Sequence, residues 1–369
     1  MQRIAGIAQA VRLTTCTLCE PGASIVPNRP VMEISMNANL TCSLTVALCA
    51  AVLAQAPAEQ TLDRVLKVTR TDSAQELQEM GTVIRSVGEI RQLAVDPLQR
   101  TISVRGSADQ IALAEWLLNE LDRSSGAQRN TAQEYRYPET PENAVRVFYL
   151  THDPNLQRLQ DITTVIRSIA EIRRAFTYSG LNAIIMRGTP DQMALADWLF
   201  RELDRPPAAR QSGPHEYRHL DPREGFVRVF YFKQTADAMS LQEIATVIRS
   251  TGEIRRAFLY RSGGALVMYG TADQVRLAEW LFNELDQPSG RMRATREYRM
   301  AVGEDPEVRV LYSSANGTAQ EFQETAKTIR MKASLRRLFT YNANRAIVLR
   351  GTPEQAALAE KLATGPANP

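Results

Sequence analysis

The chain repeats itself about every 82 residues, and this periodicity limits its fold more than any other feature. The tetrapeptide Thr82-Val83-Ile84-Arg85 recurs at residues 164–167 and 246–249, and more loosely at residues 327–330. A glycine recurs with the same steps, at Gly106, Gly188, Gly270 and Gly351. Ordinary solenoid repeats are roughly 20–50 residues long. Each copy is therefore long enough to be a small domain with a core of its own.

Four tandem repeats are expected after a separate N-terminal segment. The expected boundaries are 1–57 for a leader with a signal-like segment, and 61–123, 134–206, 216–288 and 297–363 for the repeats. The stretches between the repeats are polar and carry Pro or Gly, the composition of domain linkers.

Within the second copy, the residue pattern predicts the order strand, helix, strand, strand, helix. Residues 145–150 are typical of a strand, and apolar residues recur every three or four positions from Leu156 to Ile172, as on one helix face. Residues 175–178 and 183–186 are β-prone runs around a turn and predict a hairpin. We expect an α+β fold of four βαββα modules, each a three-stranded sheet with two helices on one face.

A capping signature opens the last helix of every copy. In the second copy, Thr189 stands at the N-cap, Pro190 at the first helical position and Gln192 at the third, which is a capping box. Gly188 directly before it is expected to end the strand with a positive φ. The same signature begins in the other copies at Ser107, Thr271 and Thr352.

Residues 40–56 have the features of a secretory signal peptide. They are small or apolar, carry no charge and end in Ala54-Gln55-Ala56, a small-x-small cleavage pattern. The segment lies far from Met1, and a start at Met36 would give it a conventional length. Export is the expectation. The alternatives are an uncleaved inner-membrane anchor, although a span needs about 20 residues, and a buried apolar segment.

The stretch from Asn182 to Asp204 resembles the second half of the periplasmic N-domains of bacterial secretins of type II, type III and pilus systems. In that family a strand of the form N-x-L/I-I/V-V-R/T-G enters a T-P-E/D-Q helix that ends in L-D. The fourth copy matches over residues 346–355, with Arg345 in place of the leading Asn. The resemblance covers nearly all of residues 61–363.

This resemblance carries expectations about fold and function. Secretin N-domains stack into rings and bind other secretion components, so the resemblance implies a binding or assembly module and no enzyme. Secretins also carry a long β-rich region that forms the outer-membrane pore. The present sequence ends at Pro369, directly after the fourth copy, so the resemblance implies N-domain-like repeats without the pore domain.

Composition and motifs favour no catalytic, cofactor or metal site. All four cysteines lie before residue 50, and the CxxC pair Cys16 and Cys19 has no second pair or nearby histidine to complete a metal or redox site. The three histidines are scattered, and the sequence has no GxSxG, HExxH, GxxxxGK[ST] or GxGxxG motif. A net charge of +3, from 44 basic and 41 acidic residues, favours neither nucleic acid nor an anionic membrane as the main partner.

The three tryptophans are candidate interaction residues. Trp116, Trp198 and Trp280 occupy the same slot of the last helix, where the fourth copy has Lys361. They could anchor a neighbouring module or another chain, since Trp is enriched at interface hot spots. They could equally cover the edge of their own core or the following linker.

Recurring arginines at the end of the first helix form the second candidate set. These are Arg91 and the pairs Arg173-Arg174, Arg255-Arg256 and Arg336-Arg337. They could form a basic stripe for phosphates or an acidic partner. The alternative is a solvated face, on which Arg85 pairs with Glu89 four residues later and cations favour the helix C-terminus.

A further arginine recurs at the end of the third strand. Arg105, Arg187 and Arg350 share this place, and the third copy has Tyr269 there. Because one copy lacks the arginine, a shared catalytic role is not indicated, and surface positions are expected.

The sequence thus predicts an exported, non-enzymatic protein that binds other proteins or itself as a scaffold. The resemblance to secretin N-domains further implies a place in the periplasm of a Gram-negative bacterium and a role as accessory of a secretion or pilus system. The alternative is a KH-like nucleic-acid-binding repeat protein, but KH domains need a Gly-x-x-Gly loop that is missing between the helices here.

Overall fold

The structure is a computed structural model, and it describes residues 61–71, 73–123, 132–137, 140–211, 215–218, 225–288, 293–301, 303–313 and 318–364. The signal-like segment and the CxxC pair lie outside these residues, as does His219. The chain divides into two units, Met1–Ala58 and Glu59–Pro369, and the second contains all four repeats.

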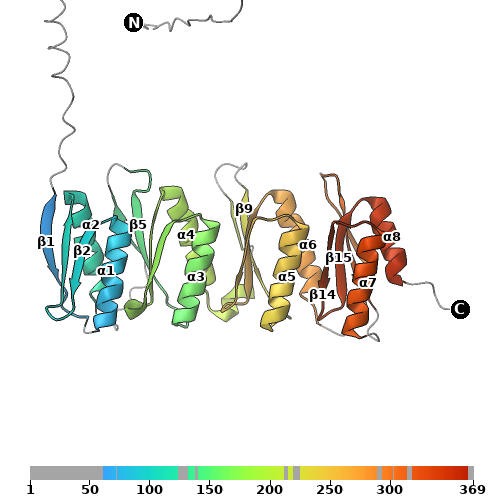
Figure 1. Cartoon of the computed structure of the whole chain (residues 1–369), viewed down its shortest axis with the longest axis horizontal. Helices are drawn as coiled ribbons and strands as arrows, with labels where there is room; N and C mark the ends of the chain where they lie inside the picture. Colours follow the sequence, from blue (N-terminus) through green and yellow to red (C-terminus); the bar gives the residue numbers. More distant parts are fainter. Residues whose placement is uncertain are drawn as a thin grey trace, which may run out of the picture. The chain divides into compact units, whose positions relative to one another are not determined.

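Every repeat contains the predicted succession of strand, helix, strand, strand and helix, and repeats 2–4 have one further strand before it (Figure 1). Repeat 1 contains β1 (Leu62–Lys67), α1 (Ala74–Gly88), β2 (Gln92–Asp96), β3 (Thr101–Gly106) and α2 (Ala108–Leu121). Repeat 2 contains β4 (Gln133–Arg136), β5 (Ala144–Tyr149), α3 (Leu156–Ile169), β6 (Arg174–Tyr178), the 3-10 helix η1 (Ser179–Leu181), β7 (Ala183–Gly188) and α4 (Pro190–Leu203).

Repeats 3 and 4 follow the same plan. After the 3-10 helix η2 (Pro207–Gln211), repeat 3 contains β8 (Glu216–Arg218), β9 (Phe226–Tyr231), α5 (Ala238–Thr251), β10 (Arg256–Tyr260), β11 (Ala265–Gly270) and α6 (Ala272–Leu285). Repeat 4 contains β12 (Arg296–Arg299), β13 (Glu307–Tyr312), α7 (Ala319–Lys332), β14 (Arg337–Tyr341), β15 (Ala346–Gly351) and α8 (Pro353–Thr364).

The α+β class is confirmed, but three sheets have four strands instead of the expected three. Repeat 1 has the order β1-β3-β2, while the others have β4-β5-β7-β6, β8-β9-β11-β10 and β12-β13-β15-β14, all antiparallel. The additional strands β4, β8 and β12 share the sequence Glu-Tyr-Arg. Three or four mostly polar residues do not show the apolar alternation that predicts a strand, so the sequence pattern missed them.

The capping boxes form as expected, but the glycine before them has another role. The side chains of Ser107, Thr189 and Thr271 each accept a hydrogen bond from the backbone N–H of the third helical residue. That residue is a glutamine in each case, and its side chain accepts a hydrogen bond from the backbone N–H of the cap. Gly188 is not among the glycines with positive φ. A Cβ at Gly188 would instead lie 2.7 Å from the Gln192 side-chain oxygen. The recurring glycine therefore makes room for the capping glutamine.

Neighbouring repeats share their cores. α1 packs against β6 and β7 of repeat 2, α3 against β10 and β11, and α5 against β14 and β15. One buried cluster joins Val83 of α1 with Val147 and Ile185 of repeat 2, and equivalent clusters span the next two boundaries. Each sheet in repeats 2–4 thus has its own helices on one face, as predicted, and the preceding repeat's helices on the other. We call each such contact a joint.

The outer sheet face of repeat 1 lacks the apolar residues of a joint. The row Val147, Ile185 and Phe176 in repeat 2 corresponds to Val65, Ser103 and Ala94 in repeat 1. The row Tyr149, Ala183 and Tyr178 corresponds to Lys67, Thr101 and Asp96. This face is polar, as in the terminal units of stacked repeats.

The helix face of repeat 4 is modified in the same sense. Met80, Val83 and Val87 are buried in α1. The corresponding residues of α7 are Thr325, Thr328 and Lys332, and none of them is buried. This face of α7 therefore lacks the apolar residues against which a further repeat of this kind would pack.

Candidate interaction surface

The first and third joints each contain a buried arginine that binds the preceding repeat. Arg187, 3% exposed, donates from Nη1 to the Val87 carbonyl of the preceding helix at 2.8 Å and from Nε to the Glu142 carbonyl at 3.0 Å. Arg350, 6% exposed, makes the equivalent bonds to the carbonyls of Thr251 and Asp305. Burial lowers the pKa of both guanidinium groups. The expectation of surface positions is wrong for both and holds only for Arg105, whose side chain is 54% exposed.

The middle joint is built differently because Tyr269 replaces this arginine. Arg256 stacks on the Tyr269 ring, 3.7 Å from its centroid, and donates to the Ile169 carbonyl at 3.2 Å. Ile169 holds the same place in α3 as Val87 does in α1. The carbonyl at the end of the first helix is thus bound by an arginine of the next repeat at all three joints.

A glutamate in a left-handed conformation faces each joint. Glu89, Glu171 and Glu253 have φ of 54°, 54° and 52°. For a residue other than glycine, this conformation costs about 1–2 kcal/mol. Their carboxylates pair with Arg174, Arg256 and Arg337 of the next repeat.

The expected helix-surface pair of Arg85 with Glu89 does not form. The helix ends before Glu89, so the glutamate leaves the helical face and turns to the next repeat. Arg85 instead donates to the Leu93 carbonyl at 2.6 Å.

The structure therefore divides the arginine pairs. The second member of each pair, at 174, 256 and 337, lies half-buried in a joint and is bound to acidic groups. The first member, Arg173, Arg255 or Arg336, is exposed, as is Arg91. Three of the seven arginines in the predicted basic stripe are consequently engaged in ion pairs inside the chain.

The three tryptophans are half-buried and contact the following repeat. Trp116, Trp198 and Trp280 lie with ring centroids 5.4, 5.5 and 5.3 Å from Tyr135, Tyr217 and Tyr298. These tyrosines belong to the additional strands. The fourth copy has Lys361 at this slot. Binding of a second protein by these rings stays a prediction.

At each joint, an acidic residue of the first helix accepts hydrogen bonds from the following repeat. Glu79 accepts hydrogen bonds from the Ser179 backbone N–H at 3.1 Å and from its hydroxyl at 2.6 Å. Asp161 with Ser262 and Glu243 with Asn342 make the same contact at the next joints. Partial burial raises the pKa of Glu79, but the bonds from Ser179 and Gln75 outweigh it and lower the pKa below the usual value.

This lowered pKa predicts acid sensitivity of the first joint. A carboxyl with a depressed pKa in the folded state stabilises it above the unfolded value of about 4.5, and that stabilisation disappears as the pH falls through the folded value. Wild type should therefore exceed Glu79→Gln in free energy of unfolding at pH 7, and the difference should shrink as the pH falls below 4.5 and the Glu79 carboxyl takes up a proton. Urea unfolding at several pH values measures this. The control is Glu324→Gln, the equivalent acid in repeat 4, which should show no such trend.

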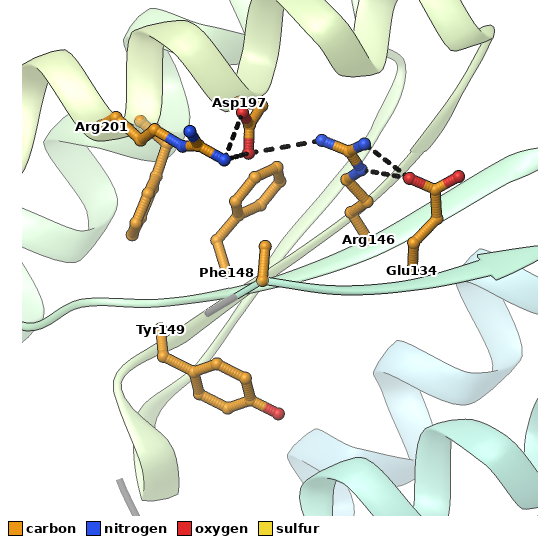
Figure 2. Close-up of a pocket in the computed structure, with 8 residues that line it drawn as sticks. Glu134, Arg146, Phe148, Tyr149, Asp197 and Arg201 are labelled. Carbon is orange, nitrogen blue, oxygen red and sulfur yellow. Dashed lines mark hydrogen bonds and ion pairs between the residues drawn. The ribbon is translucent and has the colours of Figure 1, made fainter. Parts of the chain in front are cut away.

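A groove in repeat 2 lies between its first strand and its second helix. It has a volume of about 450 Å³ and is lined by Glu134, Arg146, Phe148, Asp197 and Phe200, among others. Figure 2 shows Arg146 between Glu134 of β4 and Asp197 of α4. Its Nε lies 2.7 Å from Oε2 of Glu134, and its Nη1 lies 3.3 Å from Oδ1 of Asp197. Arg146 is thus held by two acids, and the rings of Phe148 and Phe200 stack beside it with their centroids 5.0 Å apart.

The sequence analysis overlooked this strand arginine. Arg64, Arg146, Arg228 and Arg309 recur with the steps of the other repeated residues. Each pairs with an acid of the second helix: Glu115, Asp197, Glu279 or Glu360. The periodicity alone would have revealed the arginine, and only the sheet register shows which acids it meets.

In the part of the chain that the structure describes, no cluster of His, Cys, Asp and Glu could hold a metal ion. Among the same residues, no helix is both long and apolar enough to cross a membrane.

No family model matches the chain, and no curated protein matches it. Among solved structures, the N-terminal domain of the secretin XcpQ from Pseudomonas aeruginosa is 18% identical over 40% of this chain and 63% of that one, with a TM-score of 0.17. ExeD of Aeromonas hydrophila is 12% identical over 79% and 59%, with a TM-score of 0.15. GspD in a pilotin–secretin complex from ETEC is 14% identical over 82% and 55%, also with a TM-score of 0.15.

The chain thus spans less than two thirds of the length of each of these structures. The secretins among them belong to the family that the repeats resemble in sequence. With identities below 25% and TM-scores far below 0.5, these likenesses carry no argument about activity or partners.

Proposed function

We propose that this protein is an exported, non-enzymatic scaffold that binds other polypeptides of a Gram-negative envelope, as an accessory of a secretion or pilus system. The main support is the stacking of the repeats through shared cores. Stacked repeats present equivalent residues at regular intervals, which suits an extended binding surface. The resemblance to secretin N-domains supports the envelope setting.

The exposed arginines are the partner-facing residues of this proposal. Arg173, Arg255 and Arg336 are exposed at equivalent positions of successive repeats. They can recognise carboxylates of an acidic partner without breaking a joint. The proposal gives a supporting role to the three tryptophans, Trp116, Trp198 and Trp280. Each packs against a tyrosine of the following repeat's additional strand and so helps to fix the position of that strand relative to the exposed arginines.

The structure provides two matched triple variants that test this function. Arg173→Ala, Arg255→Ala and Arg336→Ala together should abolish crosslinking to an envelope protein in cells, while urea unfolding changes by less than about 0.5 kcal/mol per site. Arg174→Ala, Arg256→Ala and Arg337→Ala together should lower stability because they remove joint ion pairs, by roughly 0.5–1 kcal/mol each.

The cells are crosslinked intact and the periplasmic fraction is then analysed, so the same experiment tests export. Recovery of the protein only from the cytoplasm would contradict the proposal. So would full retention of partner crosslinking by the exposed-arginine variant.

A further inference from the structure

The outer edge of β1 has no strand partner among the described residues. In repeats 2–4 the corresponding edges of β5, β9 and β13 are paired with β4, β8 and β12. In repeat 1 the sheet order is β1-β3-β2, and all of β1 except Leu66 is exposed. Val65 and Leu62 are 66% and 46% exposed.

The backbone of β1 is oriented for another strand. Val229 of β9 donates its N–H to the His215 carbonyl, next to β8, at 2.9 Å. Val65 has the same place in β1 as Val229 in β9. Val68 bonds to Arg100 on the β3 side, and backbone groups alternate in direction along an antiparallel strand. The Val65 N–H therefore points to the open edge.

The groove along this edge carries a basic residue for a carboxylate. It measures about 560 Å³ and is lined by Arg64, Val65, Lys67, Glu115 and Leu118, among others. The arginines equivalent to Arg64 meet the glutamate of the additional strand in the other repeats, for example Arg228 with Glu216 at 2.8 Å. Arg64 is 62% exposed and pairs with Glu115 at 2.9 Å.

The chain's own residues before β1 differ in sequence from the additional strands. At the spacing that separates β4 from β5, the residues before β1 are Ala51-Val52-Leu53-Ala54. Val52 stands where Glu134 stands in repeat 2. This stretch carries no carboxylate, whereas Glu-Tyr-Arg is present in all three additional strands.

We propose that the edge of β1 accepts an extended segment of another polypeptide, antiparallel to β1, with a carboxylate opposite Arg64. Edge addition gives affinity through backbone hydrogen bonds and specificity through side chains on alternate residues. The inference rests on the proposed protein-binding function and names the chemistry of one partner segment. Three copies of the same arrangement within this chain provide its geometry.

The test uses the full chain and a fluorescein-labelled peptide with the sequence of residues 131–137, which contains β4. Fluorescence anisotropy should show saturable binding. Val65→Pro removes the N–H that faces the edge and should weaken binding at least tenfold. Val65→Thr keeps that N–H and should bind as wild type does.

Charge reversal gives a second test that does not depend on proline. Arg64→Glu should weaken binding of the peptide at least tenfold and should restore binding of a peptide in which Arg replaces the residue corresponding to Glu134. The matched control is Arg105→Ala, on the other side of the sheet, which should leave affinity unchanged.

Four results would overturn the inference: undetectable peptide binding, affinity unchanged by Val65→Pro, protection of the Val65 amide from exchange by the chain's own residues 1–60, or dimerisation that Val65→Pro abolishes.

Failure of the inference is distinguishable from failure of the function. If cellular partners crosslink equally to wild type and Val65→Pro, the edge is not their site and the function stands. If the peptide binds in vitro but no partner crosslinks in cells, the edge stands and the function fails.

Discussion

Replacement of Arg187 by alanine is expected to lower the free energy of unfolding by about 2–4 kcal/mol, because hydrogen bonds from a buried charged group are strong and their loss leaves acceptors unpaired. The side chain donates to carbonyls of two segments and lies over Tyr137, 4.4 Å from the ring centroid. Urea unfolding followed by far-UV circular dichroism measures the effect. Unfolding in more than one step is expected, since only neighbouring repeats are coupled.

The matched control is Arg105→Ala. Arg105 has the same place in repeat 1, where no described helix covers this face of the sheet, and its side chain makes an exposed pair with Asp63 at 3.5 Å. Its removal should change stability by less than about 0.5 kcal/mol. Equal effects of the two substitutions would show that the joint does not depend on Arg187.

Ile185→Ser is expected to cost about 3–5 kcal/mol, the second large effect. Ile185 is fully buried between Val147 and Phe176 in the first joint. The substitution leaves a cavity and buries a hydroxyl in an apolar cluster. Serine is the natural residue at this position in repeat 1, where Ser103 is exposed.

The reciprocal changes Ser103→Ile and Ala94→Phe should leave repeat 1 folded and make the protein associate. They would expose an apolar row of the kind that joins the other repeats, and an exposed apolar patch favours association. Sedimentation velocity at several concentrations measures this. If Ile185→Ser costs under 1 kcal/mol and the reciprocal variant stays monomeric, the polarity of this row does not decide where repeats stack.

Sequence pattern predicted the features that depend on local interactions. The helix of Pro190–Leu203 begins at the expected cap, since the Thr189 hydroxyl and the Gln192 side chain satisfy N–H groups within one turn. The strand pair Arg174–Tyr178 and Ala183–Gly188 follows from β-prone residues around a turn. Apolar residues recur about every 3.6 residues in a helix and every 2 residues in a strand, so these patterns can be recognised without knowledge of distant contacts.

Contacts between repeats could not be predicted in this way. Arg187 and Arg105 occupy equivalent places in nearly the same local sequence, yet one is buried and the other is exposed. The difference arises because α1 covers the outer face of the sheet of repeat 2, whereas no described helix covers the outer face of the sheet of repeat 1. The exposed arginines of the candidate surface were found from the sequence, but their separation from the joint arginines required the structure.

The amino-acid sequence by itself determined the number of repeats, through its period of about 82 residues. It also determined the order of their elements and the caps of their helices, because these rest on residues a few positions apart. Only the tertiary structure decided that the repeats share cores, that Glu89 faces Arg174 across a joint, and that the edge of β1 lacks a partner among the described residues. These features depend on burial of one repeat against the next, and burial is a property of the stacked chain and not of any single segment.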